Sequence, residues 1–255
     1  MNSQNKPVAL ITGGAKRIGA AIVDDLAAHG FAVAIHANNS RDEALRKVEA
    51  IIAKGGKATA VFGDLMDSAA CGFIIDQAEA ALGPVQILVN SASVFQGDTA
   101  EKPDMAQFDA HFAMHVKAPS MLAARMVEQL AEGKSGLIVN VIDQRVWRLT
   151  PHFFSYTLSK AALWTATQTM AMAFAPHVRV NAIGPGPTLA NERQAPEDFQ
   201  AQVDAVPLRH APGLAEFGAT VRYLWDAKSV TGQMIALDSG QHLAWETPDV
   251  LNANE

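Results

Sequence analysis

The chain has 255 residues, of which 49% are hydrophobic, and its formal net charge is −6. This composition allows one large core and lacks the basic field that nucleic acid binding requires. Residues 1–7 contain no apolar signal segment, no apolar run approaches membrane-spanning length, and the single cysteine, Cys71, excludes an intrachain disulfide. We therefore expect a soluble cytoplasmic protein with neither a membrane nor a nucleic acid partner.

Short apolar runs alternate with segments of helical periodicity along the whole chain. The runs predict strands near residues 8–12, 31–36, 58–63, 86–90, 136–142, 178–183 and 233–237. The periodic segments predict helices at 17–29, 41–54, 67–82, 104–131, 153–175 and 214–226, with a shorter helix near 197–205. The alternation predicts an α/β fold, in which a seven-stranded parallel sheet has helices on both faces within a single domain spanning 1–255. In such sheets ligands bind at the carboxyl ends of the strands.

The first predicted strand, Val8 to Thr12, runs directly into a glycine-rich turn and then a helix. This arrangement lets backbone N–H groups approach a pyrophosphate at the N-terminus of the helix. Gly13 suits the tight turn, and Gly19 allows the helix to pack closely against the strand. The spacing departs from G-x-G-x-x-G, so this turn alone is also compatible with an ordinary strand-to-helix connection.

Tyr156 and Lys160 are one helical turn apart and therefore lie on the same face of a predicted helix. An ammonium group at that distance favours tyrosinate, so we expect the pKa of Tyr156 to fall from its reference value of about 10. A tyrosine of this kind is a candidate general acid for a substrate that receives hydride. Taken alone, the pair is more typical of a solvated helix.

Four motifs follow one another along the chain: Thr12-Gly13-x-x-x-x-Ile18-Gly19, Asn90-Ser91-Ala92-Ser93, Tyr156-x-x-x-Lys160 and Asn181-x-x-Gly184-Pro185-Gly186. Their order and spacing resemble those of the short-chain dehydrogenases/reductases, from about Val8 to about Leu243. The resemblance implies a Rossmann-type sheet, oxidoreductase activity with a nicotinamide dinucleotide, and a homotetramer. The cofactor-binding residues that it implies are Gly13, Arg17, Ile18, Gly19, Ser40, Asp64, Leu65, Asn90, Ser91, Ala92, Tyr156, Lys160, Pro185, Gly186 and Thr188.

The residues after the second strand indicate which cofactor binds. NAD enzymes place an acid there for the ribose 2′-hydroxyl, but the first acid in this chain is Asp42, inside the next predicted helix. Arg17, Ser40 and Arg41 instead offer cationic and hydroxyl donors that suit a 2′-phosphate. We therefore predict NADPH rather than NADH, with the alternative that Arg41 only caps a solvated helix.

Asp143 stands where most members of the family carry a serine that donates to a ketone oxygen. An ionised carboxylate cannot donate and repels an alkoxide, so it suits a substrate with N–H donors and a C=N bond in a nitrogen heterocycle. In this position the chain resembles the pteridine and dihydromonapterin reductases. The catalytic residues that the resemblance implies are Asp143, Tyr156 and Lys160. The substrate-binding residues are Arg17, Ser93, Phe95, Asp143 and Tyr156, with Phe95 stacking a pterin against the nicotinamide.

Some features depart from the family pattern or leave alternatives open. His115 replaces an asparagine that commonly supports a water path to the lysine, so it is either a proton carrier or a packed histidine. Pro187 removes a backbone donor, and residues 187–212 are the expected substrate lid. The histidines show no metal-ligand spacing, so we predict no metal. The alternatives are a ketone or aldehyde reductase, a disfavoured enoyl-thioester reductase, and a catalytically silent dinucleotide sensor.

Overall fold

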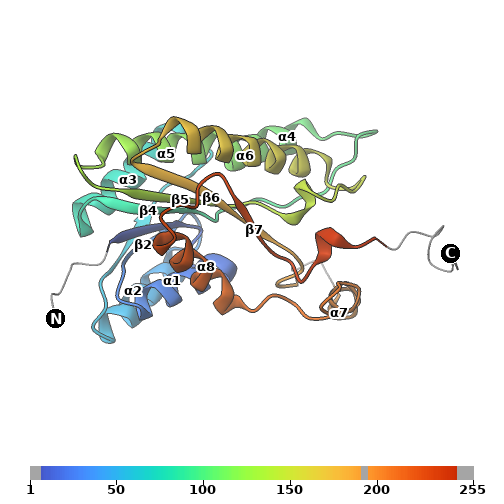
Figure 1. The fold of residues 1–255 in the computed structure, drawn as a ribbon, viewed down its shortest axis with the longest axis horizontal. Helices are drawn as coiled ribbons and strands as arrows, with labels where there is room; N and C mark the ends of the chain where they lie inside the picture. Colours follow the sequence, from blue (N-terminus) through green and yellow to red (C-terminus); the bar gives the residue numbers. More distant parts are fainter. Residues whose placement is uncertain (1–6, 191–194, 246–255) are drawn as a thin grey trace, which may run out of the picture.

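The computed structural model describes residues 7–190 and 195–245. Within them, the strands form a seven-stranded parallel sheet in the order β3-β2-β1-β4-β5-β6-β7 (Figure 1). The strands are β1 (Val8–Thr12), β2 (Ala32–Ala37), β3 (Ala58–Phe62), β4 (Val85–Asn90), β5 (Gly136–Val141), β6 (Val178–Pro185) and β7 (Met234–Leu237). The predicted seven-stranded parallel sheet of Rossmann type is therefore confirmed.

Helices cover both faces of this sheet. One face carries α3 (Ser68–Leu82), α4 (Met105–Phe112), α5 (Ala118–Gln129) and α6 (Phe154–Ala173) (Figure 1). The other carries α1 (Arg17–Ala28), α2 (Arg41–Ala53) and α8 (Leu214–Asp226). The short helix α7 (Pro196–Asp204) stands beyond the carboxyl ends of the strands (Figure 1). Two 3₁₀ turns, Gln144–Val146 and Gln241–Leu243, lie in contact with each other.

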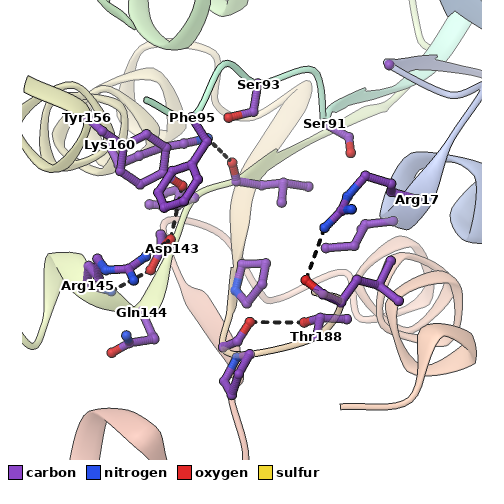
Figure 2. Close-up of a pocket in the computed structure, with 18 of the residues that line it drawn as sticks. Arg17, Ser91, Ser93, Phe95, Asp143, Gln144, Arg145, Tyr156, Lys160 and Thr188 are labelled. Atoms are coloured by element: carbon purple, nitrogen blue, oxygen red, sulfur yellow. Dashed lines mark hydrogen bonds and ion pairs between the residues drawn. The ribbon is translucent and has the colours of Figure 1, made fainter. Parts of the chain in front are cut away.

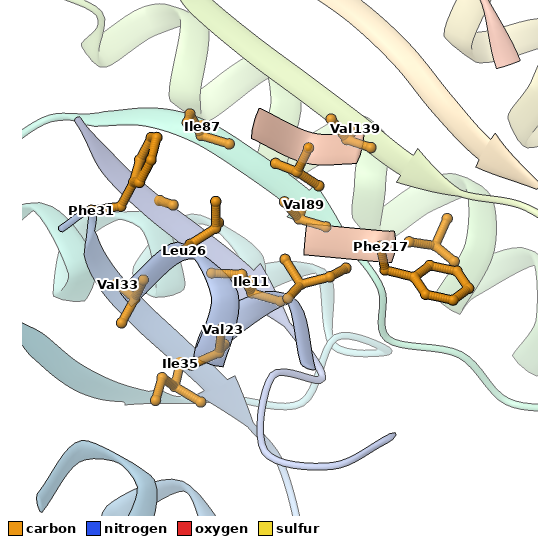
Figure 3. Packing of buried hydrophobic residues seen from close by; sticks show 14 of the residues in the cluster. Ile11, Val23, Leu26, Phe31, Val33, Ile35, Ile87, Val89, Val139 and Phe217 are labelled. Carbon is orange, nitrogen blue, oxygen red and sulfur yellow. The ribbon is translucent and has the colours of Figure 1, made fainter. Parts of the chain in front are cut away.

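Each face of the sheet has its own hydrophobic core. In Figure 3, Ile11, Val33 and Val89 of the strands pack against Val23 of α1 and Phe217 of α8. These side chains are fully buried, as expected for parallel strands that are covered on both faces. The apolar runs that predicted the strands are thus the runs that fill the core.

The predicted helix over 104–131 is interrupted, and in this respect the prediction was wrong. The helix α4 ends at Phe112, a π-helical turn follows at Ala113–Lys117, and α5 begins at Ala118. Pro119 explains the interruption, because it has no N–H to donate and its ring crowds the carbonyl four residues earlier. π-Helical turns are frequent at functional sites. This one carries His115 into the interior, where it is 1% exposed.

The connection from β3 to β4 crosses the sheet and creates a switch in strand order between β1 and β4. A hydroxyl joins the two strands there: Thr12 Oγ1 donates to the carbonyl of Val89 at 3.4 Å. It also accepts the backbone N–H groups of Ser91 and Ala92 at 3.0 and 3.1 Å. The crevice beside such a switch is where open α/β sheets bind ligands.

Candidate active site

A pocket of about 860 Å³ opens at the carboxyl ends of the strands beside this switch. It is bounded by the glycine turn after β1, the segment after β4, the end of β5, the face of α6 and the residues after β6. The predicted site residues that line it are Gly13, Arg17, Ile18, Gly19, Ser91, Ala92, Ser93, Phe95, Asp143, Tyr156, Lys160, Pro185, Gly186 and Thr188. Figure 2 shows Arg17 and Thr188 on one side of the pocket and Asp143, Tyr156 and Lys160 on the other.

The glycine turn leaves no room for a side chain at Gly13 or Gly19. Gly13 has a φ of +63°, and a Cβ added there would lie 3.0 Å from the Cα of Ala92. A Cβ on Gly19 would overlap the carbonyl oxygen of Gly13. His36, a residue that sequence reasoning did not select, holds the turn from β2, because its Nδ1 accepts the N–H of Gly13 at 3.3 Å. The sequence predicted the turn but contains no pattern that marks this support.

Arg17 adopts the left-handed backbone region, with a φ of +53°. Its guanidinium reaches across the pocket and donates to the carbonyls of Leu189 and Ala190 at 3.1 and 3.0 Å. No carboxylate pairs with Arg17 among the described residues, whereas its neighbour Lys16 forms an ion pair with Glu43 at 2.9 Å. Within 7–190 and 195–245 the Arg17 guanidinium therefore has no ion-pair partner, and it lines the pocket.

The three predicted catalytic side chains meet at the end of β5. The hydroxyl of Tyr156 donates to Oδ2 of Asp143 at 3.0 Å (Figure 2). The ammonium of Lys160 donates to the carbonyl of Val141 at 2.9 Å and lies 5.7 Å from the centre of the Tyr156 ring. Tyr156 is 5% exposed and Lys160 is 2% exposed, so both side chains are largely shielded from solvent.

The expected lowering of the Tyr156 pKa is wrong for this structure. Burial raises the pKa of Tyr156 well above its usual value, and the neighbouring Asp143 carboxylate raises it further. Burial also lowers the pKa of Lys160 to about 8, although the charge of Asp143 opposes that change. The prediction failed because it counted only the lysine four residues away. Tyr156 thus stays protonated and can act as a proton donor.

Arg145 is a site residue that the sequence reasoning missed. Its backbone N–H and its Nη1 both donate to Asp143, at 2.9 and 3.2 Å. Its guanidinium carbon lies 5.6 Å from the centre of the Phe95 ring and 5.2 Å from that of Phe153. The two rings stack with their centres 4.5 Å apart. The signal in the sequence that could have identified Arg145 is its position two residues after Asp143. The Asp143 carboxylate caps the 3₁₀ turn that contains Arg145.

Four predicted cofactor-binding residues lie outside the pocket lining: Ser40, Asp64, Leu65 and Asn90. Ser40 precedes α2, and Asp64 accepts the backbone N–H of Met66 at 2.9 Å. The side chain of Leu65 belongs to the core, and Asn90 donates to Asn140 at 2.8 Å. Their roles toward a cofactor stay predictions. No cluster of three or more metal-ligating His, Cys, Asp or Glu side chains occurs within 7–190 and 195–245.

Known proteins resemble this chain in both fold and sequence. A family model described as short chain dehydrogenase matches residues 7–200. The crystal structure of FolM alternative dihydrofolate reductase 1 from Brucella canis, complexed with NADP, is 57% identical to this chain. It superimposes with a TM-score of 0.94 over 96% of this chain and 98% of that one. The Brucella suis protein of the same name, also in complex with NADP, is 58% identical with the same TM-score and coverage.

A more distant relative agrees with this assignment. An uncharacterized oxidoreductase from Thermotoga maritima is 31% identical over 251 residues, which are 94% of this chain and 98% of that protein. The glycine turn, the Tyr156–Lys160 pair and the strand order are those that the four sequence motifs implied. The chain therefore belongs to the short-chain dehydrogenase family.

Proposed function

We propose that the chain is an NADPH-dependent reductase of a C=N bond in a pteridine, of the dihydropterin or dihydrofolate class. The 3.0 Å hydrogen bond from Tyr156 to Asp143 carries this proposal. It sets a proton donor beside a carboxylate acceptor, the pair that a ring with one N–H and one proton-accepting nitrogen requires. The ring of Phe95, 4.8 Å from that of Tyr156, offers an aromatic surface for a flat heterocycle.

The pocket residues fit a phosphorylated dinucleotide. The close packing of Gly13 and Gly19 leaves the backbone of the turn accessible at the start of α1. Arg17 supplies a cation in the pocket lining, and no acidic residue occupies positions 37–41 after β2. The NADP complexes of the two Brucella proteins support the same choice. When bound, the reduced nicotinamide supplies hydride.

The chain's own residues supply and control the proton. Tyr156, kept protonated by burial and by Asp143, gives its hydroxyl proton to the substrate nitrogen next to the reduced carbon. Asp143 stays in place through two bonds from Arg145 and accepts from a substrate N–H. The charge of Lys160, 5.7 Å from the Tyr156 ring, stabilises the phenolate that remains.

The test measures the rate of NADPH oxidation by absorbance with each of a panel of substrates: dihydrobiopterin, dihydrofolate and several small ketones. The parent enzyme should reduce the dihydropterins with much higher kcat/KM than the ketones. Asp143→Ser should lose at least about tenfold on dihydropterins, because one charged hydrogen bond is worth roughly 1.5–3 kcal/mol. It should retain ketone reduction, since the carboxylate that repels an alkoxide is gone. A parent enzyme that reduces only ketones would refute the pteridine proposal.

Other sequence-based expectations stay proposals. We propose a homotetramer located in the cytoplasm, with residues 187–212 as the substrate lid; light scattering after gel filtration tests the first. The lid region contains α7, and its residues 191–194 fall outside the described part of the chain. None of the helices within 7–190 and 195–245 combines the length and hydropathy needed to cross a membrane.

A further inference from the structure

The segment that follows β4 carries Ser93 and Phe95 into the pocket, although residues 91–98 form no helix or strand. Such a segment keeps its shape only through contacts with its neighbours. Thr12 fixes its beginning through the N–H groups of Ser91 and Ala92. Asp98 fixes its end, because its carboxylate accepts the N–H of Ser155 at 3.0 Å. The middle of the segment, next to Phe95, is contacted by a residue of the π-helical turn.

His115 makes those central contacts. Its Nε2 lies 2.9 Å from Oγ of Ser93 and accepts the backbone N–H of Val94 at 3.3 Å. Its Nδ1 lies 2.8 Å from Oγ of Ser159 on α6. The buried imidazole thus spans from the rigid helix α6 to the irregular segment that presents the aromatic surface.

The hydrogen bonds determine the protonation state of this ring. A backbone N–H can only donate, so Nε2 carries no proton, and the neutral ring must carry its proton on Nδ1. Nδ1–H then donates to Ser159, whose own hydroxyl donates to the carbonyl of Tyr156 at 2.7 Å. Burial is the main cause that lowers the pKa of His115 well below 6.5, and the nearby Lys160 and His111 lower it further.

In the described part of the chain, the direct hydrogen bonds of this side chain form no path from His115 to Lys160. The path from Nδ1 through Ser159 ends at the backbone carbonyl of Tyr156, which has no proton to pass on. Within the described residues, Lys160 donates to Val141 and has no hydrogen bond to His115. The ring lies edge-on to the Tyr156 ring at 5.4 Å, which is packing and not proton transfer.

We propose that His115 is a positioning residue for substrate: as an Nδ1–H imidazole, it fixes Ser93, Val94 and therefore Phe95 in the orientation that receives a flat heterocycle. This inference rests on the proposed function for the identity of the ligand, but not for the state of the ring. The effect should appear in substrate binding, because the contacts of His115 are with the segment that presents Phe95.

His111 provides a matched control. It is also 1% exposed, and its Nδ1 lies 2.8 Å from Ser155, as that of His115 does from Ser159. The two imidazoles stack 5.6 Å apart. No hydrogen bond joins His111 to residues 91–95 in the described structure. A purely structural role in bridging to α6 should therefore affect both histidines alike, whereas the proposal separates them.

The first experiment compares His115→Asn, His115→Gln and His111→Asn in dihydrobiopterin reduction, with thermal unfolding of each variant. His115→Asn should raise KM about tenfold, from the loss of two neutral hydrogen bonds, while kcat changes less than about threefold. His115→Gln should recover part of the loss, since one amide can accept from Val94 and donate to Ser159. NADPH affinity and the KM of His111→Asn should stay within about twofold of the parent. A fall in kcat at constant KM would overturn the proposal in favour of proton relay.

The second experiment needs no turnover and reads the state of His115 in the parent enzyme. Nitrogen-15 NMR of the histidine-labelled parent enzyme, bound to NADPH, reports the tautomer of each ring, with the His115→Gln spectrum assigning the signal. We expect the His115 signal to be that of a neutral Nδ1–H ring at neutral pH. An Nε2–H or charged ring would overturn the inference. If the parent fails to reduce dihydropterins, the proposed function fails, while this result still decides the state of His115.

Discussion

Arg17 gives the sharpest prediction, because its backbone and its side chain should have opposite effects. Its φ of +53° lies in the left-handed region, which costs a residue with a side chain about 1–2 kcal/mol and costs glycine almost nothing. Relative to alanine, glycine also lowers the free energy of unfolding by about 0.4–1 kcal/mol, because the unfolded chain with glycine has more conformational entropy. Arg17→Gly should therefore be more stable than Arg17→Ala by about 0.5–1 kcal/mol, which corresponds to a Tm about 1–4 °C higher.

Both variants remove the same guanidinium, so their effect on the cofactor should be equal. The affinity for NADPH should fall about ten- to a hundredfold, because a charge-assisted contact to phosphate is worth roughly 1.5–3 kcal/mol. The affinity for NADH should change far less. Isothermal titration with both cofactors and thermal unfolding of both variants measure these effects. Equal losses for NADPH and NADH, or an alanine variant as stable as the glycine variant, would refute the reasoning.

The remaining predictions concern the catalytic group. Tyr156→Phe should lower kcat by about 10²–10⁴-fold with NADPH affinity nearly unchanged; substantial remaining turnover would contradict its role as acid. The kcat/KM of the parent should fall as pH rises through about 8, where Lys160 loses its charge. Asp143→Asn should move this fall to lower pH, because the Asp143 carboxylate raises the pKa of Lys160. An unchanged pH profile would argue against Lys160 as the titrating group. Lys160→Met should raise Tm at pH 7, and the gain should shrink between pH 8 and 10.5, where the folded parent releases the proton that its unfolded chain still holds. A gain independent of pH would count against the buried charge.

The strands were predictable because a parallel strand buried on both faces is marked by its own local residues, such as Val8 to Thr12. The same holds for the helix ends at Gly30, Gly55 and Gly83, whose φ values are +82°, +82° and +94°. The position of Tyr156 and Lys160 in the pocket lining was predictable because the chain resembles a family there, and their catalytic role stays a prediction.

The errors arose where tertiary surroundings outweigh local pattern. The pKa of Tyr156 depends on its burial and on Asp143, 13 residues earlier, more than on the lysine one turn away. Arg145 has an ordinary sequence context, and only the 3₁₀ turn brings its guanidinium back to Asp143. The contacts of His115 join residues 22 and 44 positions away, so no local window contains them.

The Thr12 hydroxyl also has a consequence for the order of folding. It joins the end of β1 to residues 79 and 80 positions later along the chain, across the place where the strand order switches. Closing a loop of that length is slow compared with forming a helix or a neighbouring strand pair. A folding intermediate that contains β1, β2 and β3 without β4 would have the glycine turn but would lack the side of the pocket that follows β4. Cofactor fluorescence during refolding should therefore lag behind the recovery of helical signal, because the pocket forms only when both halves of the sheet have joined.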